Sequence, residues 1–219
     1  MKACMRTLVA AGLCMGMALG MVGCGSEPLD GSQVVAAVGE KEMTLGEANF
    51  LLRYQQVNTE FYYESMFGAG IYDKDLYGTG TSYGVEFKKD VMEQLQEYYI
   101  TEEKAADYGI ALTDEEKAAI TDAAAAFLAE NNTNTKEQMT ADQATVERIL
   151  TLMTFRSKVA AAVKAEADVT ATDEEAAQEE AQTEYYNGVL ETWKAESPIT
   201  VDEAVWEQVV FDRSYDPAS

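Results

Sequence analysis

The chain has 219 residues, a formal net charge of −23 and no histidine. The absence of histidine excludes Ser-His-Asp and Cys-His catalysis as well as histidine-based zinc sites, and most hydrolase mechanisms are excluded with them. The strong negative charge makes nucleic acid an implausible partner, because its phosphates are repelled by an acidic surface. The sequence therefore predicts no catalytic residue, no cofactor and no metal site.

Residues 1–23 have the pattern of a signal peptide. Lys2 and Arg6 form a short basic region, and residues 8–22 carry no charge. This uncharged run is shorter than the roughly 20 apolar residues that a membrane-spanning helix needs. The segment is therefore expected to direct export and to be removed, leaving no permanent membrane span.

The leader ends in the sequence Met21-Val22-Gly23-Cys24. This sequence resembles the lipobox of bacterial lipoproteins, in which a small residue precedes a cysteine that is acylated and becomes the new N-terminus. The resemblance implies lipidation of Cys24, an extracytoplasmic location and anchoring to the cell membrane through the lipid. Removal of residues 1–23 would also remove Cys4 and Cys14, so the mature chain would form no disulfide. An ordinary secretory signal with an incidental cysteine is the alternative.

Residues 24–33 are expected to form a flexible, lipid-anchored tether, and residues 34–219 a single domain. The apolar run Val34–Val38 predicts a short strand, and the turn and residues 39–43 that follow allow a hairpin. A second strand is predicted at Ile199–Val201 near the other end of the domain. We expect these two strands to pair, which would bring the N-terminal and C-terminal segments together.

Helical patterns fill the domain between the two strands. Capping boxes, in which a Thr and a Glu three positions later satisfy each other's unpaired backbone N–H groups, begin at Thr44, Thr113 and Thr172. A loop rich in glycine interrupts the helical pattern at residues 68–84. Helices are expected over residues 44–67, 85–108, 114–131, 141–168, 173–195 and 202–210. The predicted fold is mostly α, with a small two-stranded element.

Aromatic side chains concentrate at the end of the first helix and in the glycine-rich loop. Aromatic rings with a polar tip on an irregular segment suit a non-specific surface for apolar peptide. Aromatic residues on the later helices have the spacing of core residues. The candidate peptide-binding residues are Tyr62, Tyr63, Phe67, Tyr72, Tyr77 and Tyr83.

Three segments, taken in order behind the lipobox, carry a resemblance to a known family. They are Val34-Val35-Ala36-Ala37-Val38-Gly39 leading through Met43-Thr44 into a helix, Tyr108-Gly109-Ile110 leading to Glu116, and Val189 to Lys194 running into Ile199-Thr200-Val201-Asp202. Together they resemble the core of the SurA/PrsA-type foldase lipoproteins and periplasmic chaperones. In that family an N-terminal helical region and a C-terminal strand and helix form one chaperone domain, with a parvulin prolyl-isomerase domain inserted between them.

The insertion would fall within residues 170–197, and these 28 residues are fewer than the roughly 50 of a minimal domain. The family's histidine-bearing isomerase site also has no counterpart in this chain. The resemblance therefore implies a membrane-anchored chaperone or foldase-like protein that binds unfolded or nascent exported proteins without an isomerase site of its own. A ligand-binding or adhesion surface lipoprotein and a prolyl isomerase of another design remain alternatives, and the oligomeric state stays open.

Overall fold

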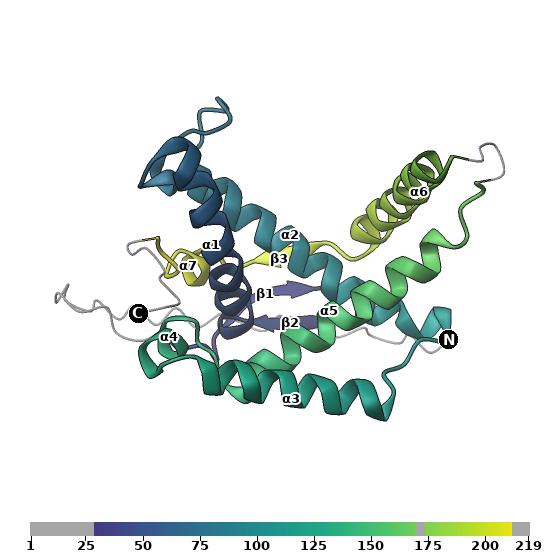
Figure 1. Ribbon diagram of the computed structural model, residues 1–219, viewed down its shortest axis with the longest axis horizontal. Helices are drawn as coiled ribbons and strands as arrows, with labels where there is room; N and C mark the ends of the chain where they lie inside the picture. The colour runs from purple at the N-terminus through teal and green to yellow at the C-terminus, as the bar shows by residue number, and fades with distance from the viewer. Residues whose placement is uncertain (1–28, 170–173, 212–219) are drawn as a thin grey trace, which may run out of the picture.

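The computed structural model describes residues 29–169 and 174–211. In these residues, helices surround a small antiparallel sheet (Figure 1). The protein is therefore mostly α, which confirms the predicted fold class. The signal peptide, Cys24 and the capping box predicted at Thr172 lie outside the described residues.

The central strand of the sheet is β1 (Val34–Val38). It pairs antiparallel with β2 (Lys41–Thr44) on one side and with β3 (Ile199–Val201) on the other. The predicted pairing of the N-terminal and C-terminal segments is thereby confirmed. The sequence predicted a two-stranded element, whereas the sheet has a third strand. Gly39 adopts a φ of 58° and turns the chain back, so that β2 joins the sheet.

The helices follow the predicted order with shifted ends. They are α1 (Leu45–Phe67), η1 (Ile71–Asp73), α2 (Tyr83–Lys104), η2 (Ala105–Tyr108), α3 (Asp114–Glu130), α4 (Thr133–Gln138), α5 (Gln143–Lys164), α6 (Glu175–Glu196) and α7 (Glu203–Trp206). The short helix α4 was not predicted, because six residues are too few to show a helical period. The helix predicted at residues 202–210 is correct only in its first part, since α7 ends at Trp206.

Local capping fixes the starts of α1 and α3. The Thr44 backbone N–H donates to the Glu47 carboxylate at 2.7 Å, and the Glu47 N–H donates to Thr44 Oγ1 at 3.2 Å. Thr113 and Glu116 make the same reciprocal pair at 2.7 and 3.1 Å. Two of the three predicted capping boxes are thus confirmed.

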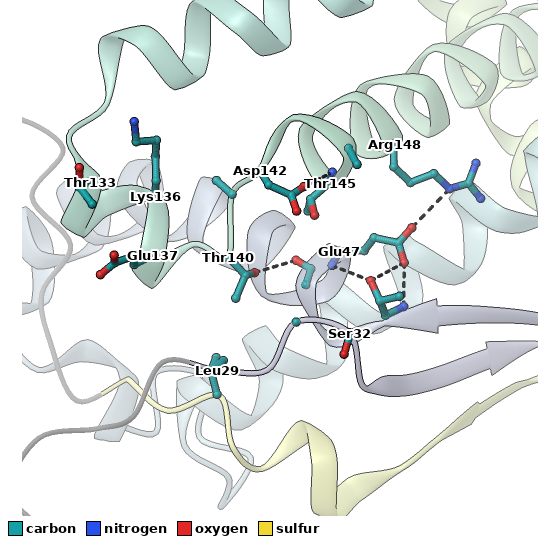
Figure 2. A pocket seen from close by; sticks show the side chains of 15 residues that line it. Leu29, Ser32, Glu47, Thr133, Lys136, Glu137, Thr140, Asp142, Thr145 and Arg148 are labelled. Atoms are coloured by element: carbon teal, nitrogen blue, oxygen red, sulfur yellow. Dashed lines mark hydrogen bonds and ion pairs between the residues drawn. The ribbon is translucent and has the colours of Figure 1, made fainter.

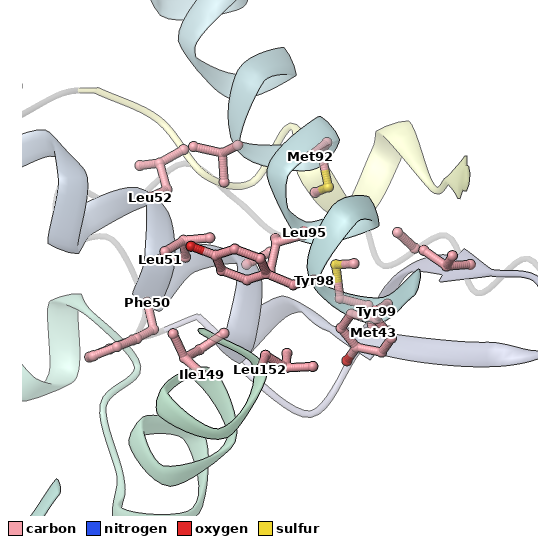
Figure 3. Packing of buried hydrophobic residues seen from close by; sticks show 14 of the residues in the cluster. Met43, Phe50, Leu51, Leu52, Met92, Leu95, Tyr98, Tyr99, Ile149 and Leu152 are labelled. Carbon is pink, nitrogen blue, oxygen red and sulfur yellow. The ribbon is translucent and has the colours of Figure 1, made fainter. Parts of the chain in front are cut away.

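The core lies between α1, α2, α5 and the sheet, all of which contribute buried side chains (Figure 3). Its large buried side chains include Met43, Leu51, Leu52, Leu95, Tyr99, Ile149 and Leu152. Burial of each aliphatic side chain of this size stabilises the fold by about 1.5–3 kcal/mol. The core holds the helices near the sheet, while the end of α1 and the start of α2 extend away from it (Figure 1).

An ion-pair network joins α5 to α1 and α2 beside this core. Arg148 Nη2 donates to Glu102 Oε2 at 2.9 Å, and Arg148 Nε lies 3.4 Å from Glu47 Oε1. The Tyr99 hydroxyl donates to the Glu47 carboxylate at 3.0 Å. Burial alone would raise the pKa of Glu102, but the hydrogen bond and charge of Arg148, together with the charge of Lys41, hold that pKa below its usual value.

Candidate functional site: an aromatic tip between helices α1 and α2

The chain turns sharply at the end of α1. Gly68 adopts a φ of 76°, and the Lys74 ammonium donates to the carbonyl oxygens of Phe67 at 2.7 Å and Gly68 at 3.2 Å. A cation in this position satisfies carbonyl groups that the helix leaves unpaired and interacts favourably with the helix dipole. The last turn of α1 and the loop that follows are therefore held together.

Hydrogen bonds also order the second part of the loop. The Asp75 carboxylate accepts from the backbone N–H groups of Thr79 at 3.0 Å and Gly80 at 2.8 Å, and the Tyr83 N–H donates to the Lys74 carbonyl at 2.7 Å. The hydrogen bond from Gly80 is the main cause that lowers the pKa of Asp75. The loop is an internally bonded turn that leads directly into α2.

All six aromatic residues predicted from the sequence belong to one cluster of ring contacts. The ring of Tyr63 is central on the α1 side. Its centroid lies 5.3 Å from that of Tyr62, 5.9 Å from that of Phe67 and 5.2 Å from that of Tyr83. Tyr83 thus connects the end of α1 to the start of α2.

The remaining members of the cluster gather around Tyr83. Its ring centroid lies 5.7 Å from that of Tyr72, 5.9 Å from that of Tyr77 and 5.8 Å from that of Phe87. Between the buried rings of Tyr72, Tyr83 and Phe87, contacts at these distances add about 0.5–1.5 kcal/mol per pair beyond the burial of area. The aromatic cluster is therefore a packed element that supports the end of the α1–α2 hairpin.

Burial divides the six candidate residues into two groups. Tyr62, Phe67 and Tyr77 are exposed, at 60%, 47% and 57% of their surface, and Tyr63 is half-buried. Tyr72 and Tyr83 retain only 7% and 4%. The structure therefore places these two tyrosines in a buried layer of the cluster and not on its exposed surface.

The physical reason lies in contacts that the sequence does not reveal. The turn η1 folds Tyr72 back onto α2, and Tyr83 is the first residue of α2 instead of a loop residue. Both rings pack against Phe87, and Tyr72 also packs against Phe211 from the far end of the chain.

The sequence analysis did not predict one exposed apolar residue near these rings. Met66 is 52% exposed and lies on α1 four positions after Tyr62, so the two side chains share a helix face. The tip surface, as we use the term below, consists of Tyr62, Met66, Phe67 and Tyr77. The i, i+4 spacing from Tyr62 was the signal that could have identified Met66.

The phenols of Tyr72, Tyr77 and Tyr83 have raised pKa values and stay neutral at physiological pH. The hydrogen bond with Tyr63, whose hydroxyl lies 3.5 Å from that of Tyr77, raises the pKa of Tyr77 to about 12. Burial raises the pKa of Tyr72 and that of Tyr83. The tip surface therefore offers apolar rings and the neutral hydroxyl group of Tyr77, which can contact peptide.

A second candidate site is a cavity of about 850 Å³ between the starts of α1 and α5 and the helix α4 (Figure 2). Its lining includes Glu47, Lys136, Thr140, Asp142 and Arg148. Thr140 adopts a φ of 52°, an uncommon value for a β-branched residue, and its hydroxyl donates to the Gly46 carbonyl at 3.0 Å.

Four of the charged side chains that line this cavity already have partners. Arg148 pairs with Glu47, the Asp142 carboxylate accepts from the Thr145 N–H at 2.7 Å, and the Lys136 ammonium donates to a backbone carbonyl at 3.2 Å. The cavity has the size of a ligand site, but its charges are of mixed sign and most of them are used within the fold.

Among residues 29–169 and 174–211, no group of three or more Asp, Glu, Cys or His side chains could hold a metal ion. No helix in this part of the chain is both long and apolar enough to cross a membrane. Comparisons of the chain with protein-family models, with curated proteins and with solved structures find no match.

Proposed function

We propose that this chain is an extracytoplasmic, membrane-anchored chaperone-like protein that binds unfolded exported polypeptides through its tip surface. The observation that carries the proposal is the tip surface itself, where four large apolar residues are each about half exposed or more. Contiguous apolar side chains at a protein surface commonly mark a site of interaction. The lipid on Cys24, implied by the lipobox, would hold this surface on the outer side of the membrane.

The structure beneath the tip surface supports this role. Tyr63 and Tyr83 pack directly under the exposed rings, so the rings are presented on a firm base. Rigid aromatic side chains offer a large contact area at a small cost in conformational entropy. Their hydroxyl groups can also donate to the backbone of a client chain, which suits a surface that binds many sequences. The proposal includes no isomerase activity.

The proposal is tested by removing the exposed rings together. A variant carrying Tyr62→Ser, Phe67→Ser and Tyr77→Ser should lose most of its ability to suppress aggregation of an unfolded exported protein at stoichiometric amounts. Its melting temperature should change little, because exposed positions usually contribute less than about 0.5 kcal/mol each. The matched control replaces Tyr54 and Tyr185, two exposed tyrosines outside the tip surface, with Ser.

The two possible failures have different meanings. If the triple variant is folded and protects the client as well as the wild type does, the client surface lies elsewhere. If the wild-type protein itself gives no protection at any ratio, the chaperone proposal is wrong.

The cavity favours a second candidate function, that of a ligand-binding lipoprotein. Its volume of about 850 Å³ lies within the usual range of small-molecule sites. Thermal-shift screening with small molecules tests this function, with Ala144→Tyr as a variant that fills the cavity. A compound that raises the melting temperature of the wild type but not of the variant would favour this alternative.

A further inference from the structure

We propose that the aromatic cluster contains a slot for one aromatic side chain of an extended polypeptide, and that Phe211 of the chain's own C-terminal segment fills this slot in the structure. The inference rests on the proposed function and specifies what part of a client would be recognised. It also accounts for part of the burial of Tyr72, on which Phe211 stacks.

The walls of the slot are aromatic. The ring of Phe211 stacks on that of Tyr72 with centroids 4.0 Å apart and planes 4° from parallel, and the Phe87 centroid lies 5.9 Å away. Gly84 leaves the space that the ring uses, because a Cβ atom there would lie only 3.1 Å from the Phe211 ring. The slot is thus shaped for a flat side chain.

Two cations hold the backbone that leads into the slot. The Lys88 ammonium donates to the carbonyl oxygens of Trp206 at 2.7 Å and Val209 at 2.9 Å, and Arg53 Nη2 donates to that of Val210 at 2.8 Å. Every polypeptide has such carbonyl groups. The contact between Arg53 and the Val210 carbonyl is therefore of a kind that gives affinity for an extended segment, while the slot selects the side chain.

The occupant is suited to exchange. Val210 and Phe211 belong to no helix or strand, and Val210 is 48% exposed, whereas Trp206 and Val209 are buried. Val210 and Phe211 can therefore leave the slot while Trp206 and Val209 stay packed. The Tyr72 hydroxyl is buried without a hydrogen-bond partner among the described residues, so the resident segment does not satisfy every polar group of the slot.

The slot is also continuous with the tip surface. Tyr83 contacts Tyr72, which forms the slot, and Tyr77, which belongs to the tip surface. A client that lies across the tip surface would therefore reach the slot with a neighbouring residue. Displacement of Phe211 would be the step that admits the aromatic side chain of the client.

The test compares the wild-type protein with Phe211→Ala. The probe is a fluorescent peptide with the sequence of residues 205–211, and a second peptide carries Ala in place of its terminal Phe. If the slot is open about a tenth of the time in the wild type, emptying it should tighten binding of the Phe peptide about tenfold. Binding of the Ala peptide should not change. Val85→Ala, an exposed position on α2 outside the slot, is the control and should bind like the wild type.

Aggregation suppression is measured on the same samples, so that the two proposals can fail separately. Unchanged binding of the Phe peptide by Phe211→Ala, in a protein that still suppresses aggregation, would overturn the slot and leave the proposed function standing. A wild-type protein that neither binds the Phe peptide nor suppresses aggregation would overturn both proposals. If Phe211→Ala does not fold, Phe211→Leu replaces it, because leucine keeps the slot partly filled. Tighter binding of the Phe peptide by this variant would then support the slot, and unchanged binding would overturn it.

Discussion

Tyr77 and Tyr83 are in ring contact, with centroids 5.9 Å apart, yet Tyr77 is 57% exposed and Tyr83 only 4%. One ring of this pair faces solvent and the other supports it from within the α1–α2 hairpin. Two tyrosines that look equivalent in the sequence therefore have different roles, and substitutions at the two positions should have different effects.

We predict that Tyr83→Ser lowers the free energy of unfolding by about 3–5 kcal/mol, as expected when a buried aromatic ring is removed. Tyr77→Ser should cost less than about 0.5 kcal/mol, because its side chain is mainly exposed. Urea denaturation of the two single variants measures both values. Equal losses would contradict the division of the cluster into a buried layer and an exposed surface.

The ion pair between Glu102 and Arg148 should make stability depend on pH in the acid range. Because the folded-state pKa of Glu102 is lowered, its contribution is complete above the unfolded-state pKa of about 4.3 and is lost as the pH falls through the lower folded-state value. Glu102→Gln should cost about 1–3 kcal/mol at pH 7. The cost should shrink as the pH falls below about 4. Thermal unfolding of both proteins at a series of pH values measures this cost, and a cost that is the same at every pH would contradict the contribution of the ion pair.

The central strand of the sheet offers a matched pair of neighbouring valines. Val35 is fully buried, whereas Val34 is 42% exposed. We expect Val35→Ala to lower the free energy of unfolding by about 1–3 kcal/mol and Val34→Ala by less than about 0.5 kcal/mol. Chemical denaturation of both variants checks this difference, and a similar small loss at both positions would argue against a firmly packed sheet.

Membrane anchoring should depend on Cys24 alone among the three cysteines of the chain. Cys24→Ser removes the thiol that acylation requires, so the protein should be unprocessed or released from the membrane. Cys14→Ser, in the segment expected to be removed, should leave anchoring unchanged. Detergent-phase partitioning separates the outcomes, and a Cys24→Ser protein that partitions like the wild type would contradict the lipoprotein interpretation.

Features that depend on residues close in the chain could be predicted from the sequence. The capping boxes at Thr44 and Thr113 involve groups three positions apart, so the residue types themselves specify the starts of α1 and α3. The apolar runs at Val34–Val38 and Ile199–Val201 also sufficed to predict that the two ends of the domain pair, because two short strands can satisfy their backbone groups on each other.

The division of the aromatic residues was decided only by the tertiary structure. The spacing of Tyr72 and Tyr83 within a glycine-rich stretch indicates no burial, because the rings that bury Tyr72 include Phe211, more than a hundred positions away. Likewise, the sequence identified the tip as aromatic but could not determine which of its rings face solvent. A side chain is exposed or buried according to what packs against it, and for this cluster the packing comes from α2 and the C-terminal segment.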